Sequence, residues 1–163
     1  MYSGKDFEND LVQSAKNQNR LDHFIRLYDP TGKKRGVSNP CDFIYHVGGK
    51  TCLLELKTSQ TGRFDFSLMT DNQYEEIKNR VRKVYGMVGG FLFYDRKNTL
   101  VYYFSINSIF MAKEVNFLKS IKSGEYCKYG FPVKFKIKRV HIEIDIEHLK
   151  ETILKSKSYT KGG

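Results

Sequence analysis

Asn39-Pro40-Cys41-Asp42-Phe43 and, twelve residues after its aspartate, Leu54-Glu55-Leu56-Lys57 are the stretches that decide the fold. Side chains alternate between two faces along residues 42–47 and 52–57, and Gly48-Gly49-Lys50 between them predicts a turn, so the two runs are predicted to pair as strands of a hairpin. Because alternate strand residues share a face, Asp42 and Glu55 should lie near one end of the hairpin, with Lys57 beside them.

This arrangement suits a metal ion held next to a phosphate. Two carboxylates, a backbone carbonyl such as that of Leu56, and water molecules are ligands that Mg²⁺, or Mn²⁺ as a substitute, prefers. Lys57 could then orient a hydrolytic water and neutralise charge that builds on phosphorus. The alternative is a solvated strand face with cross-strand ion pairs. The apolar neighbours Ile44, Leu54 and Leu56 favour the functional interpretation, because central strands seldom carry charges without a use.

A helix is predicted from about Lys5 to Leu27, on the spacing of its apolar residues Phe7, Leu11, Ala15, Phe24 and Leu27. Glu8 flanks that stripe and is expected to face the hairpin, whereas Asp6 and Asp10 are expected to stay in water. The alternative for Glu8 is an acid that interacts with the helix dipole.

A second helix is predicted from Thr70 to about Tyr85. Its start, Thr70-Asp71-Asn72-Gln73, fits a capping box, which is the structural alternative to a site role for Gln73. Cations that could contact DNA phosphates lie on this helix, in the loop before it and in the loop before Asp42: Lys33, Lys34, Arg35, Arg63, Lys78 and Arg82.

The rest of the chain continues an α/β order with no repeat and no linker, so residues 1–163 are predicted to form one domain. Strands are predicted at 91–94, 100–104 and 134–140, the last of them basic, and helices at 106–111 and 147–154. The segment 119–130 is expected to be mobile, and the tail 155–163 flexible.

Composition favours a polyanionic partner. The 163 residues carry 28 Lys and Arg against 18 Asp and Glu, a formal charge of +10, which favours nucleic acid through counterion release. No run approaches the about 18 to 20 apolar residues of a spanning helix, and no signal-peptide pattern opens the chain, so no membrane partner is expected. Cys41, Cys52 and Cys127 show no zinc-site spacing and are expected to be reduced thiols of a cytoplasmic protein.

In order along the chain, several motifs resemble the PD-(D/E)XK nucleases, and among them the RecU-like Holliday junction resolvases, including small phage versions. The resemblance runs through Gly4-Lys5-Asp6-Phe7-Glu8, Pro40-Cys41-Asp42-Phe43, Leu54-Glu55-Leu56-Lys57-Thr58-Ser59, Phe66-Ser67-Leu68 and Gln73, and extends to Ile144-Asp145-Ile146. It implies a restriction-endonuclease-like α/β core, a central mixed β-sheet flanked by helices. It also implies active-site roles for Glu8, Asp42, Glu55, Lys57 and Gln73, with metal bound by Asp42, Glu55 and Glu8.

The sequence and this resemblance together predict a Mg²⁺-dependent endonuclease that resolves four-way DNA junctions by paired nicking. Two symmetric nicks imply a homodimer, because an isologous dimer supplies two sites related by a two-fold axis. A bacterial or phage origin is expected, with action in the bacterial cytoplasm. Two alternatives stay open: a restriction-like or repair nuclease acting on linear or single-stranded DNA, and a non-catalytic basic DNA-binding module.

Overall fold

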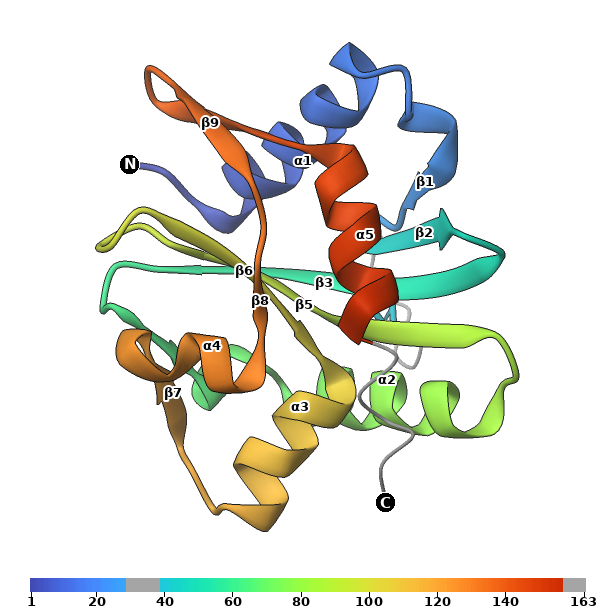
Figure 1. Ribbon diagram of the computed structural model, residues 1–163, viewed down its shortest axis with the longest axis vertical. Coiled ribbons are helices and arrows are strands. Elements are labelled where there is room, and N and C mark those ends of the chain that lie inside the picture. The colour runs from blue at the N-terminus through green and yellow to red at the C-terminus, as the bar shows by residue number, and fades with distance from the viewer. Residues whose placement is uncertain (29–38, 157–163) are drawn as a thin grey trace, which may run out of the picture.

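A six-stranded sheet forms the centre of the protein (Figure 1), in a computed structural model that describes residues 1–28 and 39–156. The strand order is β1-β2-β3-β5-β6-β8, in which β3 and β5 are parallel and every other neighbouring pair is antiparallel. The predicted mixed sheet flanked by helices is therefore confirmed. Its strands are β1 (Phe24–Arg26), β2 (Phe43–Val47), β3 (Lys50–Ser59), β5 (Met87–Asp95), β6 (Leu100–Ser105) and β8 (Phe131–Pro132).

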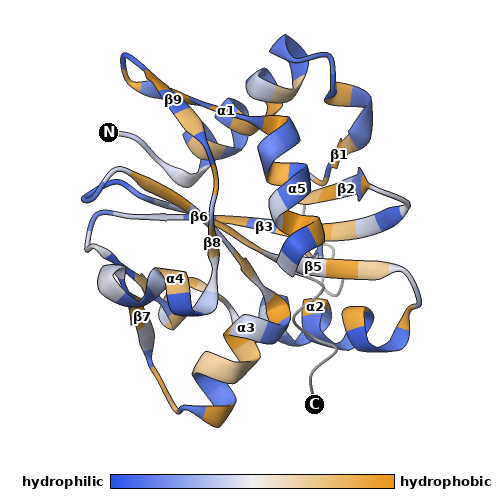
Figure 2. Ribbon diagram, viewed as in Figure 1, coloured by the Kyte–Doolittle hydropathy of each residue, from blue (hydrophilic) through white to orange (hydrophobic). Residues whose placement is uncertain are grey.

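Helices cover both faces of this sheet, and each face has its own apolar core. One face packs against α1 (Gly4–Asn17), α5 (Ile146–Ser156) and the small sheet of β9 (Phe135–Lys138) and β10 (His141–Ile144). The other packs against α2 (Asp71–Lys83), α3 (Ile106–Phe110), α4 (Tyr126–Tyr129) and the small sheet of β4 (Arg63–Asp65) and β7 (Ser120–Lys122). Figure 2 shows hydrophobic and hydrophilic bands in turn along α2 and α5, as expected of helices with one buried side.

The predicted β2–β3 hairpin is present. Its turn uses Gly48 and Gly49 at positive φ of 51° and 71°, which residues without a Cβ adopt at little cost. The register pairs Phe43 with Leu54 and Ile44 with Leu53. Leu53 belongs to the core on the α2 side, so Glu55 and Lys57, two and four residues later on the strand, face α2 as well.

The chain returns from β3 to the parallel strand β5 through β4 and α2. Gly90 in β5 allows β6 to lie very close, because a Cβ there would stand 2.3 Å from the carbonyl oxygen of Phe104. This crossover places the first turn of α2 over the middle of β3, where Glu55 lies.

The first helix is shorter than the apolar spacing predicts. It ends at Asn17, Asn19 takes a positive φ of 54°, and a short 3-10 turn then leads into β1. Phe24 is a strand residue whose ring stacks on that of Tyr45 with centroids 4.0 Å apart. The expectation of a mobile segment at 119–130 is also wrong, because β7 and α4 occupy it and both Ile121 and Tyr126 are fully buried.

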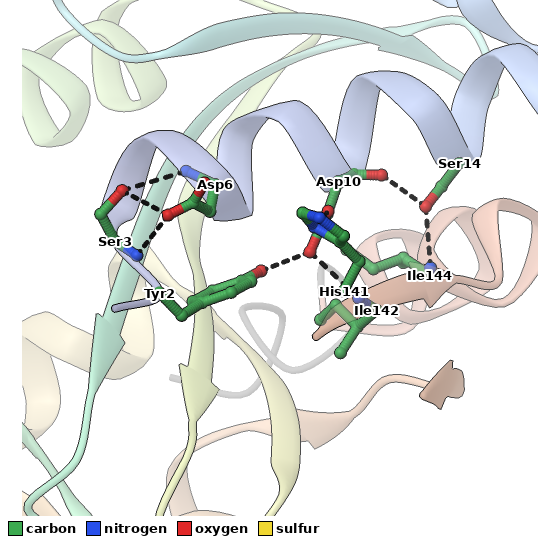
Figure 3. A network of polar contacts seen from close by, with 8 residues as sticks. All are labelled: Tyr2, Ser3, Asp6, Asp10, Ser14, His141, Ile142 and Ile144. Atoms are coloured by element: carbon green, nitrogen blue, oxygen red, sulfur yellow. Dashed lines mark hydrogen bonds and ion pairs between the residues drawn. The ribbon is translucent and has the colours of Figure 1, made fainter. Parts of the chain in front are cut away.

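Asp10 is buried, contrary to the expectation that it stays in water. Its Oδ2 accepts hydrogen bonds from the Tyr2 hydroxyl at 2.5 Å and the Ile142 amide at 3.0 Å, and its Oδ1 lies 2.8 Å from His141 Nδ1 (Figure 3). Asp6, in contrast, is an N-terminal cap partner of Ser3.

Asp10, Ser14 and Gln18 form a series of hydrogen bonds to backbone groups at the edge of β10 and just after it, here called the ladder. One turn later the Ser14 hydroxyl accepts the Ile144 amide at 2.9 Å, as Figure 3 also shows. Just beyond the helix, Gln18 donates to the Ile144 carbonyl at 2.7 Å and accepts from the Ile146 amide at 2.9 Å. These side chains, four residues apart, satisfy backbone groups that a neighbouring strand would otherwise pair.

Candidate active site

Asp42 stands directly before β2, and its carboxylate is fixed over the middle of β3. Its Oδ2 accepts a hydrogen bond from the Leu56 amide at 2.7 Å. This contact brings the Asp42 carboxylate close to that of Glu55, and the repulsion between the two contributes to the raised pKa of Glu55. The sequence prediction that these two acids meet at one end of the hairpin is therefore confirmed in geometry.

Glu55 is the most buried charged group of the site, with 2% of its surface exposed. Its Oε1 lies 2.9 Å from Lys57 Nζ and accepts a hydrogen bond from Gln73 Nε2 at 2.6 Å. Its Oε2 is buried and has no hydrogen-bond partner among the described residues. Burial and the nearby Asp42 carboxylate raise the pKa of Glu55 to about 7, although the Lys57 ammonium acts in the opposite direction.

Gln73 serves the helix and the site together. The first turn of α2 is a capping box, in which Gln73 Oε1 accepts from the Thr70 amide at 3.1 Å and Thr70 Oγ1 accepts from the Gln73 amide. Gln73 Oε1 also accepts a hydrogen bond from Lys57 Nζ at 3.2 Å, and Gln73 Nε2 donates one to Glu55. The capping box predicted from the sequence is therefore confirmed, and the same side chain also contacts Glu55 and Lys57.

Glu8 approaches this cluster from α1 and adds to the repulsion that raises the pKa of Glu55. Its carboxylate is held by Arg26 of β1, whose Nη2 lies 2.7 Å from Glu8 Oε2 and whose Nη1 donates to Asn9 at 2.9 Å. Arg26 was missed by the sequence analysis. The strand that carries it has only three residues and falls inside the region predicted as helix, so no pattern marks it.

The three predicted metal ligands are not gathered into one group. Within residues 1–28 and 39–156, no three Asp, Glu, His or Cys side chains lie close enough together to hold a metal ion. A contribution of Glu8 through a water stays a prediction. Two carboxylates do fit a hard divalent cation that keeps several of its waters, as Mg²⁺ does. The partnerless Glu55 Oε2, buried beside Asp42, is the observation that favours such a cation.

The cations predicted to contact DNA have different surroundings in the structure. Lys33, Lys34 and Arg35 lie outside the described residues. Arg63 is half exposed, 3.9 Å from Asp65. Lys78 is engaged by Glu75 and Glu114 at 2.9 and 3.0 Å, and Arg82 lies over the Phe110 ring at 4.7 Å.

The cysteines agree with the sequence analysis in being unpaired: Cys41 and Cys52 are buried, and Cys127 is exposed. Burial, reinforced by the Glu55 and Asp42 carboxylates, raises the pKa of the Cys41 thiol to about 12. Cys41 therefore acts as a packing residue beside the site and has little thiolate character.

No protein-family model matches this chain, and no curated protein matches it in sequence. Among solved structures, it is similar to Archaeoglobus fulgidus Hjc, a Holliday junction resolvase from an archaeal hyperthermophile. The TM-score is 0.52 at 18% sequence identity, over 79% of this chain and 95% of that one. The similarity shows a shared fold, a mixed sheet flanked by helices. Among the described residues, no helix is long and apolar enough to cross a membrane.

Proposed function

We propose that the protein is a metal-dependent endonuclease that resolves branched DNA, with four-way junctions as its preferred substrate. The observation that carries the proposal is the cluster of Asp42, Glu55, Lys57 and Gln73, on a fold similar to that of a Holliday junction resolvase. The formal charge of +10 supports a polyanionic substrate.

The reaction is hydrolysis of a phosphodiester bond: a water oxygen bonds to phosphorus as the bond from phosphorus to the leaving sugar oxygen breaks. A Mg²⁺ or Mn²⁺ ion bound there would lower the pKa of a water and stabilise negative charge on the phosphate oxygens. Asp42 and Glu55 would hold the ion, Glu55 through its partnerless Oε2. Glu8, already held by Arg26, would act through an intervening water.

Lys57 would position the attacking water and offset charge at phosphorus. Its ammonium has a fixed position, because Glu55 Oε1 and Gln73 Oε1 lie 2.9 and 3.2 Å away, and the side chain is 18% exposed. A cation held in place in a mostly buried site stabilises developing negative charge more than a cation in water does. Gln73 would hold both Glu55 and Lys57 in place.

We further propose that the protein works as a homodimer, because paired nicks across a junction need two sites related by two-fold symmetry. The same core could instead act on linear or single-stranded DNA, and a binding module without catalysis would leave the carboxylates structural.

The decisive experiment compares a labelled four-way junction with a linear duplex of equal length, in Mg²⁺ or in EDTA. The proposal predicts paired, Mg²⁺-dependent nicks in the junction, lost in Asp42→Asn and kept in Glu151→Gln, an exposed carboxylate on α5. Equal cutting of both substrates would reduce the proposal to a general nuclease. Binding without cutting under every metal condition would favour the binding module.

The Asp42→Asn variant also separates the catalytic from the structural interpretation. Removing one of two crowded carboxylates should leave junction affinity equal or higher, because repulsion from phosphate decreases. A folded variant with markedly weaker binding would instead assign Asp42 to the binding surface.

A further inference from the structure

The hairpin of β9 and β10 presents cations to solvent on an arm beside α1. Lys134 precedes β9, Lys136 and Lys138 lie within it, and Arg139 opens the turn; all four are exposed. Lys138 forms an ion pair with Glu143, and Lys136 lies opposite the same carboxylate in the register of the hairpin. Among the described residues, Lys134, Lys136 and Arg139 form no ion pair of their own. Figure 1 shows the turn that follows β9 at the edge of the molecule.

The cations on β9 recur at every second residue. Lys136 and Lys138 therefore project from the same face of the strand, about 6.8 Å apart along it, and Lys134 continues the alternation. A row of this kind can meet separate phosphates of one nucleic-acid strand. The tip is also partly apolar, since Ile137 and Val140 are 60% and 75% exposed.

The arm is fastened to α1 by buried polar contacts. Asp10 and Ser14 accept the amides of Ile142 and Ile144, and His141 lies against Asp10 Oδ1 (Figure 3). Buried, paired hydrogen bonds of this kind fix the position of an element. A binding surface that is already held in position loses less conformational entropy when it binds.

The same helix carries Glu8, which approaches the candidate active site. Glu8 and Asp10 are two residues apart on α1, so they leave the helix on nearly opposite sides, within one turn of each other. The arm and the site are therefore tied to a single turn of one helix, and a strand bound along β9 would have a defined distance to the site.

We propose that the β9–β10 hairpin is a DNA-binding arm, whose Lys134, Lys136 and Arg139 contact backbone phosphates of the substrate outside the scissile position. The proposal rests on the proposed function, because it takes DNA as the partner. Charge complementarity supports this choice: Lys134 and Lys136 continue the alternation along β9, Arg139 adds a third exposed cation at the turn, and a polyanion can contact all three.

The test measures binding without cutting. The triple variant Lys134→Gln/Lys136→Gln/Arg139→Gln is made in an Asp42→Asn background, and its affinity for a labelled junction is titrated over a salt series in EDTA. Three lost phosphate contacts should reduce the slope of log affinity against log salt by about 2 to 3, with affinity at least about tenfold lower at low salt. A matched control, Lys16→Gln/Lys97→Gln/Lys128→Gln, removes three exposed cations elsewhere and should change the slope by less than about 1.

An unchanged slope in the arm variant, or an equal decrease in the control, would overturn the proposal, once circular dichroism shows both variants folded. So would arm-dependent binding to phosphatidylglycerol vesicles together with unchanged DNA binding, which would assign the arm to an anionic membrane. This test does not depend on cleavage. If the arm variant binds DNA more weakly but the protein never cuts DNA, the arm proposal stands and the nuclease proposal fails. If the protein cuts junctions but the arm variant binds them normally, the nuclease proposal stands and the arm proposal fails.

Discussion

Burial and a second carboxylate act together on Glu55, while Lys57 and Gln73 stabilise only one of its two oxygens. This imbalance makes Glu55 costly to ionise in the folded chain. A cation bound at the other oxygen would stabilise the ionised carboxylate. Glu55 is therefore the residue whose ionisation a bound metal would favour most.

The first prediction concerns stability against pH. The pKa of Glu55 is raised from 4.5 to about 7, so its contribution to stability is fully present below pH 4.5 and is lost as pH rises through about 7. In EDTA, Glu55→Gln should therefore gain unfolding free energy relative to the parent as pH increases between these values. Urea denaturation across this range checks it, and a difference between the two proteins that stays constant with pH would contradict it.

The second prediction concerns metal affinity. An ion at Glu55 must displace a proton near neutral pH, so Mg²⁺ should bind more tightly at about pH 8 than at about pH 6, with proton release. Calorimetry in two buffers of different ionisation enthalpy measures both quantities. Asp42→Asn should weaken the binding at either pH, and pH-independent affinity would place the ion elsewhere.

The third prediction concerns the catalytic role proposed for Lys57. Lys57→Met keeps most of the side-chain length but removes the ammonium, and it should lower the cleavage rate by roughly 10² to 10³ while junction affinity changes little. Single-turnover cleavage at saturating enzyme separates rate from binding. Rates close to those of the parent would assign Lys57 to holding Glu55 and to nothing else.

At the scale of elements, side chains of α1 and Gln18 form the hydrogen bonds that a neighbouring strand would form with backbone groups of β10 and Ile146. The Ser14 hydroxyl is buried and accepts the Ile144 amide while donating to the Asp10 carbonyl at 2.6 Å. Ser14→Ala leaves that buried amide without a partner, which should cost about 1 to 3 kcal/mol of unfolding free energy. Gln13→Ala, one residue earlier on the exposed side of α1, is the control and should change stability by no more than about 0.5 kcal/mol.

The sequence predicted the elements wherever the pattern is local and regular. The β2–β3 hairpin, with its alternating strands around two glycines, and the capped start of α2 are of this kind. The meeting of Asp42 with Glu55 followed from that hairpin. The end of α1 at Asn17 and the strand β1 that follows were not predictable in this way, because a three-residue strand has too few residues to show a period.

The missed contacts are those that depend on segments distant in the sequence. Arg26 reaches Glu8 across 18 positions, and Asp10 reaches Ile142 across 132. Asp10 was expected in water because the apolar stripe of α1 excludes it. One signal was present: Asp10, Ser14 and Gln18 recur every four residues, which marks a second, polar stripe on the same helix.

At the scale of the whole molecule, the proposed homodimer predicts a pattern of cutting. In a heterodimer of the parent with Asp42→Asn, each junction should receive one nick from the intact site, whereas the parent homodimer should give paired nicks in a single encounter. A supercoiled plasmid with an extruded cruciform distinguishes nicked circles from linear product. Linear product from the heterodimer would show that one subunit cuts both strands.

The ladder also determines where the length of the chain can change. One residue inserted between Asp10 and Gln18 would rotate the residues after it by about 100°, so that Asp10, Ser14 and Gln18 could no longer all face β10. The turn at Arg139 and Val140 lies outside both strands, so residues added there would lengthen the arm without rotating any of these contacts away from β10. Insertions and deletions in sequences of this fold should therefore accumulate at the tip of the hairpin and avoid the helix that holds it.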